Sequence, residues 1–119
     1  MTIDVRSRGW AVAPELRDYF ERRVGHALRR LGPVVRGVTA YLEDMNGPRG
    51  GVDKRCRLVV RLARGGEITA AEVGAAERTV VDGAIARLGR AVRHALDRHR
   101  HRDRRTWAAD KNPMYAFGG

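Results

Sequence analysis

Apolar and polar residues follow two different periods along this chain of 119 residues. Strict alternation near the N-terminus predicts a half-buried strand over residues 2–8, which Gly9 ends. Helical spacing follows, and Pro14 suits the first turn of a helix because its missing N–H group is not needed there. The apolar positions at this spacing are Leu16, Phe20, Val24, Ala27, Leu28 and Leu31. We therefore expect a first helix that runs from Pro14 to the Gly-Pro pair at residues 32–33.

Three more strands are predicted in the middle of the chain. Residues 34–44 are rich in β-branched and aromatic side chains, which favour strands. The next strand, over residues 55–64, alternates apolar residues with arginines, and residues 67–73 form the last one. Glycine and proline in residues 45–53 predict a long exposed loop, whereas the glycine pair at 65–66 predicts a tight turn.

The last regular element is a helix that starts near Ala76 and has a wide apolar face. Its apolar positions are Val81, Ala84, Ile85, Leu88, Val92, Ala95 and Leu96. No period remains from Asp103 onward, so we expect residues 103–119 to be a flexible tail after one domain over residues 1–102. The order β-α-β-β-β-α, with one apolar face on each element, predicts an α+β two-layer sandwich. In this fold two helices cover one face of a four-stranded sheet.

Composition excludes several classes of protein. Cys56 is the only cysteine, so the chain can form neither an internal disulfide nor a cysteine-based zinc site. The position of Cys56 on an apolar strand face predicts a buried, inert thiol. No apolar run approaches the roughly 20 residues that span a bilayer, and the N-terminus lacks the apolar segment of a signal peptide. We therefore expect a cytoplasmic protein without a membrane partner.

No residue pattern indicates catalysis or a bound cofactor. His94, His99 and His101 lie close together in the sequence, but His94 and His99 do not share a helical face, so we expect no metal site. The glycine-rich residues 46–51 lie between two strands and lack the Lys-Ser/Thr pair of a phosphate-binding loop. The sequence therefore predicts no enzyme, no cofactor and no small-molecule substrate.

Positive charge is the strongest functional signal in the sequence. The chain has 24 Lys and Arg residues against 14 Asp and Glu, a net charge of +10, and nearly all its cations are arginines, whose planar donors suit phosphate. Residues 85–105 alone hold eight arginines against two aspartates, a net charge of +6.

On each predicted helix, basic residues form one stripe away from the apolar positions. The stripes consist of Arg22, His26, Arg29 and Arg30 on the first helix and of Arg87, Arg90, His94 and Arg98 on the second. We expect two helices side by side to present these stripes as one basic surface that binds an RNA backbone.

Four local strings occur in an order that is known from one protein family. The first strand, Ile3–Arg8, ends in a basic residue, and Ala13–Phe20 (APELRDYF) forms the start of the first helix. Cys56–Leu62 precedes the glycine pair at 65–66, and Val81–Arg90 (VDGAIARLGR) lies in the second helix. Together these strings resemble the ribosome hibernation-promoting factor and ribosome-associated inhibitor family over roughly residues 2–100.

The resemblance implies a fold related to double-stranded-RNA-binding domains and a partner in the small ribosomal subunit. It implies binding in the channel of messenger and transfer RNA, which silences and stabilises idle ribosomes. By position, the residues that would contact small-subunit ribosomal RNA are Arg8, Arg22, Arg29, Arg87 and Arg90.

The sequence departs from the family pattern in two places. Arg78 stands where the family has an aromatic residue near the start of the second helix, so we expect different local packing there. The C-terminal domain of long family members is absent, as in a short form, so we do not expect this chain alone to pair ribosomes. The oligomeric state of the chain stays open.

Two other functions are compatible with the same residues. A generic double-stranded-RNA or messenger-RNA-binding module would carry the same basic helices. A protein–protein adaptor would instead use the open face of the sheet, where the predicted register places Thr39, Tyr41, Arg57 and Arg61.

Overall fold

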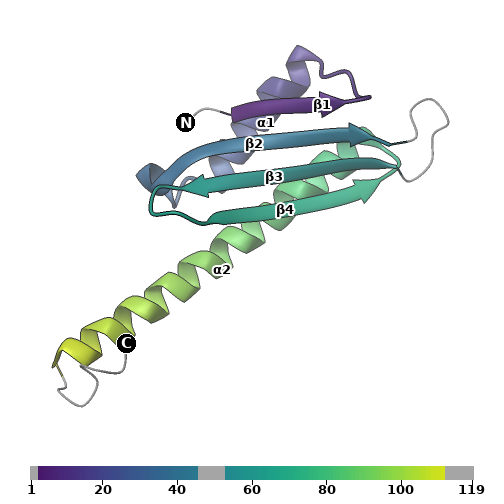
Figure 1. The fold of residues 1–119 in the computed structure, drawn as a ribbon. Coiled ribbons are helices and arrows are strands. Elements are labelled where there is room, and N and C mark those ends of the chain that lie inside the picture. Colours follow the sequence, from purple (N-terminus) through teal and green to yellow (C-terminus); the bar gives the residue numbers. More distant parts are fainter. Residues whose placement is uncertain (1–2, 46–52, 112–119) are drawn as a thin grey trace.

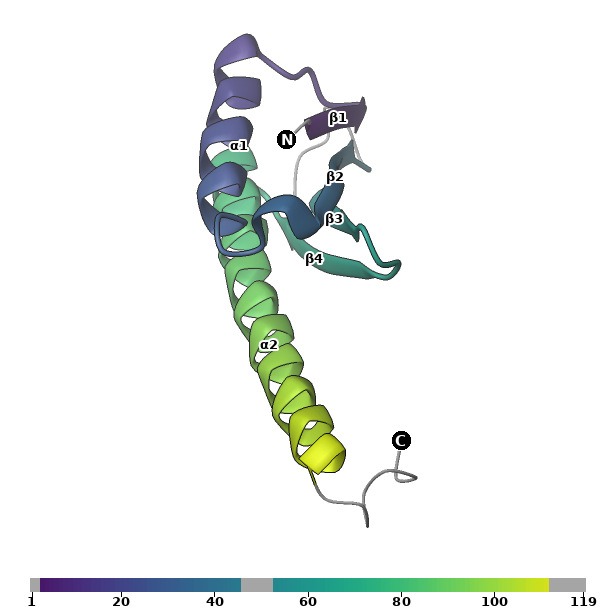
Figure 2. The same cartoon turned by 90° about the vertical axis from the view of Figure 1, so that its left-hand side faces the viewer.

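The computed structural model describes residues 3–45 and 53–111, with side chains described as far as Arg98. The elements are β1 (Ile3–Arg8), α1 (Pro14–Ala27), the 3-10 turn η1 (Gly32–Val34), β2 (Val35–Asp44), β3 (Lys54–Leu62), β4 (Glu67–Gly74) and α2 (Glu77–Lys111). Figures 1 and 2 show both helices on the same side of the sheet. The predicted element order and the α+β two-layer fold are therefore confirmed.

The four strands lie in the order β1-β2-β3-β4. The outer strand β1 runs parallel to β2, with α1 as the crossover between them, and the other two pairs are antiparallel. Tyr41 lies opposite Arg57, and Thr39 lies opposite Val59. Because opposite residues share a face of the sheet, Thr39, Tyr41, Arg57 and Arg61 all lie on the face that the helices leave open.

The core lies between the sheet and the two helices. Fully buried side chains come from α1 (Phe20, Val24), from the central strands (Leu42, Leu58) and from α2 (Leu88). Except for Leu42, these are positions that the two sequence periods assign to the apolar faces. Cys56 is buried among them, as predicted, and desolvation raises the pKa of its thiol to about 12. Trp10, which the sequence pattern assigned to no element, is also in the core with an exposed fraction of 4%.

The first helix ends earlier than predicted. α1 ends at Ala27, where the N–H group of Leu28 still donates to the carbonyl of Val24. Leu28 and Leu31 are buried as expected, but they lie in the turn after the helix rather than on it. The reason is topological: the chain must pass from the helix layer to the sheet before β2, and this passage takes up residues 28–34.

The second helix is longer than predicted. α2 continues to Lys111, so residues 103–111, which the sequence analysis assigns to the flexible tail, are part of the helix. A helix that is already nucleated adds each further residue at little cost, even without an apolar face, and this stretch contains neither glycine nor proline. Figure 1 shows α2 extending well past the edge of the sheet. The remaining tail, residues 112–119, and the predicted loop at residues 46–52 lie outside the described residues.

Candidate nucleic-acid interface

All nine basic residues that the sequence analysis assigns to the RNA-binding surface have exposed side chains. The positions differ in part from the prediction, because Arg29 and Arg30 lie in the turn that follows α1. Arg22 and His26 lie on α1, and the four residues of the second stripe lie on α2.

Arg8 lies on the other side of the molecule from the helices. It is the last residue of β1, and Ile3 of the same strand is buried toward the helices. Alternation along the strand turns Arg8 to the open face of the sheet, opposite Glu43 in the register. Arg8 therefore does not share a surface with the helical stripes.

The stripe on α2 lies beside the edge strand β4. Arg87 donates from Nε to Oε2 of Glu72 on β4, over 3.2 Å. The two elements approach closely here, since a Cβ atom at Gly83 would lie 2.7 Å from Cγ of Glu72. The pKa of Glu72 is lowered by the backbone N–H of Val73, then by the hydrogen bond from Arg87 and by the charge of Arg90. One of the predicted RNA contacts is thus already paired with a carboxylate.

The side of α2 that faces α1 carries different groups. The hydroxyl of Tyr19 on α1 donates to the carboxylate of Asp82 on α2. Asp82 and Arg87 are five residues apart, which separates them by about 140° around a helix. At Arg87 the α2 stripe therefore points away from α1, toward β4. One basic surface along both helices stays a prediction.

Tyr19 is surrounded by three guanidinium groups. The Cζ atom of Arg78 lies 3.9 Å from the centre of the Tyr19 ring, and Nε of Arg78 lies 3.7 Å from Oδ2 of Asp82. Arg22 and Arg23 approach the same ring at 5.9 Å each. Arg78, the predicted departure from the family pattern, thus packs as a cation against an aromatic ring. The sequence reasoning did not identify Arg23, and the clue it lacked was its position one turn from Tyr19.

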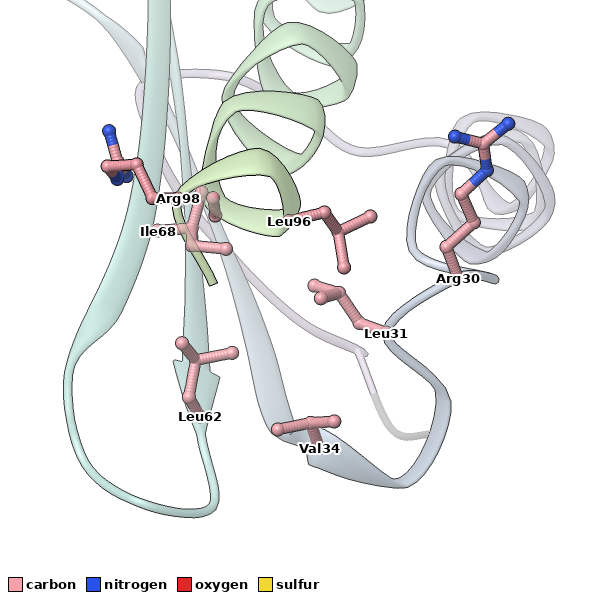
Figure 3. A pocket seen from close by; sticks show the side chains of 8 residues that line it. Arg30, Leu31, Val34, Leu62, Ile68, Leu96 and Arg98 are labelled. Carbon is pink, nitrogen blue, oxygen red and sulfur yellow. The ribbon is translucent and has the colours of Figure 1, made fainter. Parts of the chain in front are cut away.

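One residue from each stripe, Arg30 and Arg98, lies at the end of the sheet that holds the β3–β4 turn. A groove of about 270 Å³ lies there, between α2 and the turn after α1. Its apolar lining consists of Leu31, Val34, Leu62, Ile68, Ala95 and Leu96. Arg30 and Arg98 complete the lining, and Figure 3 shows them on opposite sides of the apolar side chains. Sequence periods cannot reveal such a groove, because it is formed by elements far apart in the chain.

Two further predictions concern metals and membranes. Within residues 3–45 and 53–98 no group of three or more His, Cys, Asp and Glu side chains is placed to hold a metal ion. His94 is exposed on α2, whereas the side chains of His99 and His101 lie outside the described residues. Neither helix, as far as it is described, is long and apolar enough to cross a membrane.

The sequence matches the profile of one protein family over residues 3–100, nearly the whole described chain. That family is described as Sigma 54 modulation protein / S30EA ribosomal protein. The chain belongs to this family. The predicted resemblance to ribosome hibernation factors is therefore confirmed at the level of the family, whose members are ribosome-associated modulation proteins. No curated protein gives a significant sequence match.

Solved structures of two other proteins share the fold of this chain. The N-terminal domain of Protein Y from Thermus thermophilus is similar with a TM-score of 0.65 and 22% identity, over 79% of this chain and 98% of that one. A ribosomal subunit interface protein from Coxiella burnetii is similar with a TM-score of 0.58 and 18% identity, over 81% and 99%. At these identities the likeness shows a common fold.

Proposed function

We propose that this S30EA protein inhibits translation by binding small-subunit ribosomal RNA in the path of messenger and transfer RNA, where it stabilises idle ribosomes. The observation that carries the proposal is a set of exposed arginines on the helix side that form no ion pair within the part of the chain whose side chains are described. These are Arg29, Arg30, Arg90 and Arg98. Such guanidinium groups are available to phosphate.

The predicted site residues contribute unequally in this proposal. Arg90, His94 and Arg98 present the α2 stripe to the RNA backbone, and Arg29 and Arg30 extend it across the end of the sheet. Arg87 contributes less, because a phosphate has to compete with Glu72 for its guanidinium. Arg8 contacts RNA only if RNA also reaches the open face of the sheet.

Family membership supports the ribosome as the partner, and the name of the Coxiella burnetii relative places that protein at a subunit interface. A ribosome-bound protein of this kind acts in the cytoplasm. Neither catalysis nor a cofactor is part of the proposed mechanism, because the protein inhibits by occupying the RNA path.

The test is co-sedimentation with purified ribosomal subunits over a range of salt concentrations. We expect binding to the small subunit with a log–log salt slope of about −4 to −5, as five or six neutralised phosphates would give. Messenger RNA and transfer RNA bound beforehand should block it. A slope near zero, or equal binding to blocked subunits, would contradict the proposal.

Matched variants separate the proposed surface from general charge. The double variant Arg90→Gln/Arg98→Gln should weaken binding strongly, and Arg6→Gln/Arg55→Gln, which removes two charges from the open face, should weaken it little. The opposite ranking would favour the open face as the interface. Equal affinity of the unmodified protein for any RNA duplex and for the small subunit would favour a generic RNA-binding module.

A further inference from the structure

The groove at the end of the sheet combines an apolar floor with two cationic sides. Leu31 and Ile68 are buried in its floor, with exposed fractions of 8% and 7%, whereas Val34 is 42% exposed at its rim. Arg30 and Arg98 are both exposed and lie on opposite sides of the groove (Figure 3). An occupant that satisfies all these groups has an apolar body with a negative charge at each end.

The chemistry of the lining narrows the choice of occupant. Among the residues whose side chains are described, the lining includes no carboxylate, hydroxyl or amide, and its polar side chains are the two arginines. A second copy of this chain is disfavoured, because it would bring another net charge of +10 against these arginines. The volume of about 270 Å³ lies just below the range of pockets for drug-sized ligands, so it suits one small ring system.

We propose that this groove accepts one unstacked RNA base, whose flanking phosphates are bound by Arg30 and Arg98. A base offers two apolar faces to the aliphatic floor, and its backbone supplies a negative charge on either side. This inference rests on the proposed function, since it adds a base contact to the same RNA-binding surface. The aliphatic floor has no donor or acceptor to read a base edge, so the groove binds all four bases with similar affinity.

The experiment compares two RNA probes that have the same phosphates. One probe is heptauridylate, whose bases stack weakly, and the other is an abasic heptamer of the same length. Fluorescence anisotropy at fixed salt should show that the protein binds heptauridylate about fivefold more tightly, the effect of burying about 40 Å² of apolar base surface. Equal affinity for the two probes would overturn the proposal.

Variants that fill the groove test whether the preference for heptauridylate over the abasic probe arises there. Ala95→Leu and Val34→Phe each enlarge an apolar side chain of the lining, and Val34 is exposed enough for a larger residue to leave the fold intact. Both should reduce the fivefold ratio toward one while the abasic probe binds as before. Arg30→Gln/Arg98→Gln should instead weaken both probes alike. A ratio that survives in correctly folded Ala95→Leu and Val34→Phe proteins would overturn the proposal.

A third probe separates RNA from a protein partner. The acidic peptide Asp-Glu-Phe-Glu-Asp carries an apolar ring between negative charges, and we expect it to bind more weakly than heptauridylate. Tighter peptide binding that Ala95→Leu abolishes would overturn the proposal in favour of a protein segment. If the unmodified protein binds the two RNA probes equally but still binds the small subunit in a salt-dependent way, only this inference is refuted. If it does not bind the small subunit, the proposed function is refuted.

Discussion

The open face of the sheet and the basic end of the helix layer, which consists of Arg29, Arg30 and Arg98, are both rich in arginine. They differ in whether the guanidinium groups contact other side chains of the protein. On the open face four guanidinium groups contact neighbours on the same sheet, whereas Arg8 forms no ion pair with any residue whose side chain is described. The contacts are Arg6 to Asp4 at 2.9 Å, Arg55 to Glu43 at 3.0 Å, Arg61 to the hydroxyl of Thr39 at 2.8 Å, and Arg57 over the ring of Tyr41 at 4.6 Å. The contacts of Arg55 with Glu43 and of Arg57 with Tyr41 follow from the strand register, which sets these residues opposite one another.

At the basic end, by contrast, Arg29 and Arg30 belong to a turn and Arg98 to a helix that passes beyond the sheet, and none of the three forms an ion pair with a residue whose side chain is described. The comparison teaches that arginine content alone does not identify a phosphate-binding surface. Exposed ion pairs contribute little to stability, but a guanidinium that already has a partner gains less from a phosphate.

Both regions depend on the same core, so damage to the core should affect them equally. Leu88 is fully buried on α2, and Leu88→Ala should lower the free energy of unfolding by about 2–5 kcal/mol through loss of contacts and a residual cavity. Thermal unfolding measures this as a melting temperature at least about 8 °C lower. The control Arg90→Gln removes an exposed group and should melt within a few degrees of the parent. A selective loss of ribosome binding in folded Leu88→Ala protein would contradict this expectation.

The Glu72–Arg87 ion pair tests whether an arginine that is bound to a carboxylate contributes less to RNA binding. Glu72→Gln removes the carboxylate that Arg87 contacts, which makes the α2 stripe resemble the unpaired basic end. We expect small-subunit affinity to rise roughly fourfold at moderate salt, the effect of about one added phosphate contact. The matched control is Glu43→Gln on the open face, which frees Arg55 and should leave affinity unchanged. Equal gains in both variants would indicate a general charge effect.

The contact between Tyr41 and Arg57 tests the structural role of the open face. Tyr41→Ala removes the ring beneath the guanidinium and should lower the free energy of unfolding by about 0.5–1 kcal/mol for the cation–π contact, in addition to the lost packing. Binding to the small subunit should not change. Chemical denaturation and co-sedimentation measure the two effects, and a binding defect without a stability defect would reassign this face to RNA or to a protein partner.

The smallest expected effect is on the titration of Glu72. The pKa of this carboxyl lies below its usual value, chiefly because of the Val73 N–H and secondly because of Arg87. A lowered pKa stabilises the fold above the unfolded-state value, and this contribution disappears as the pH falls through the folded-state value. In the Arg87→Gln variant, NMR titration should show that the pKa of Glu72 rises but stays below the ordinary value of a glutamate. A full return to normal would contradict the leading role of the backbone donor.

Much of the fold was predictable because secondary structure follows from local periodicity. Alternation in β3 identified Cys56 as buried, and helical spacing identified the buried and exposed sides of α2. The exposure of the predicted basic residues followed in the same way, since a stripe opposite the apolar face is exposed whatever the helix packs on. The start of α1 at Pro14 was equally local, because that residue suits only the first turn.

The sequence by itself therefore determined the order of the elements and the side of each that is buried. Only the tertiary structure decided how those elements are oriented around one another. It placed the α2 stripe beside β4, paired Arg87 with Glu72 fifteen residues away, and brought Arg30 and Arg98 to one groove. The physical reason is that a period defines an angle about an element's own axis, whereas contacts between elements depend on sheet order, the crossover and the turn after α1.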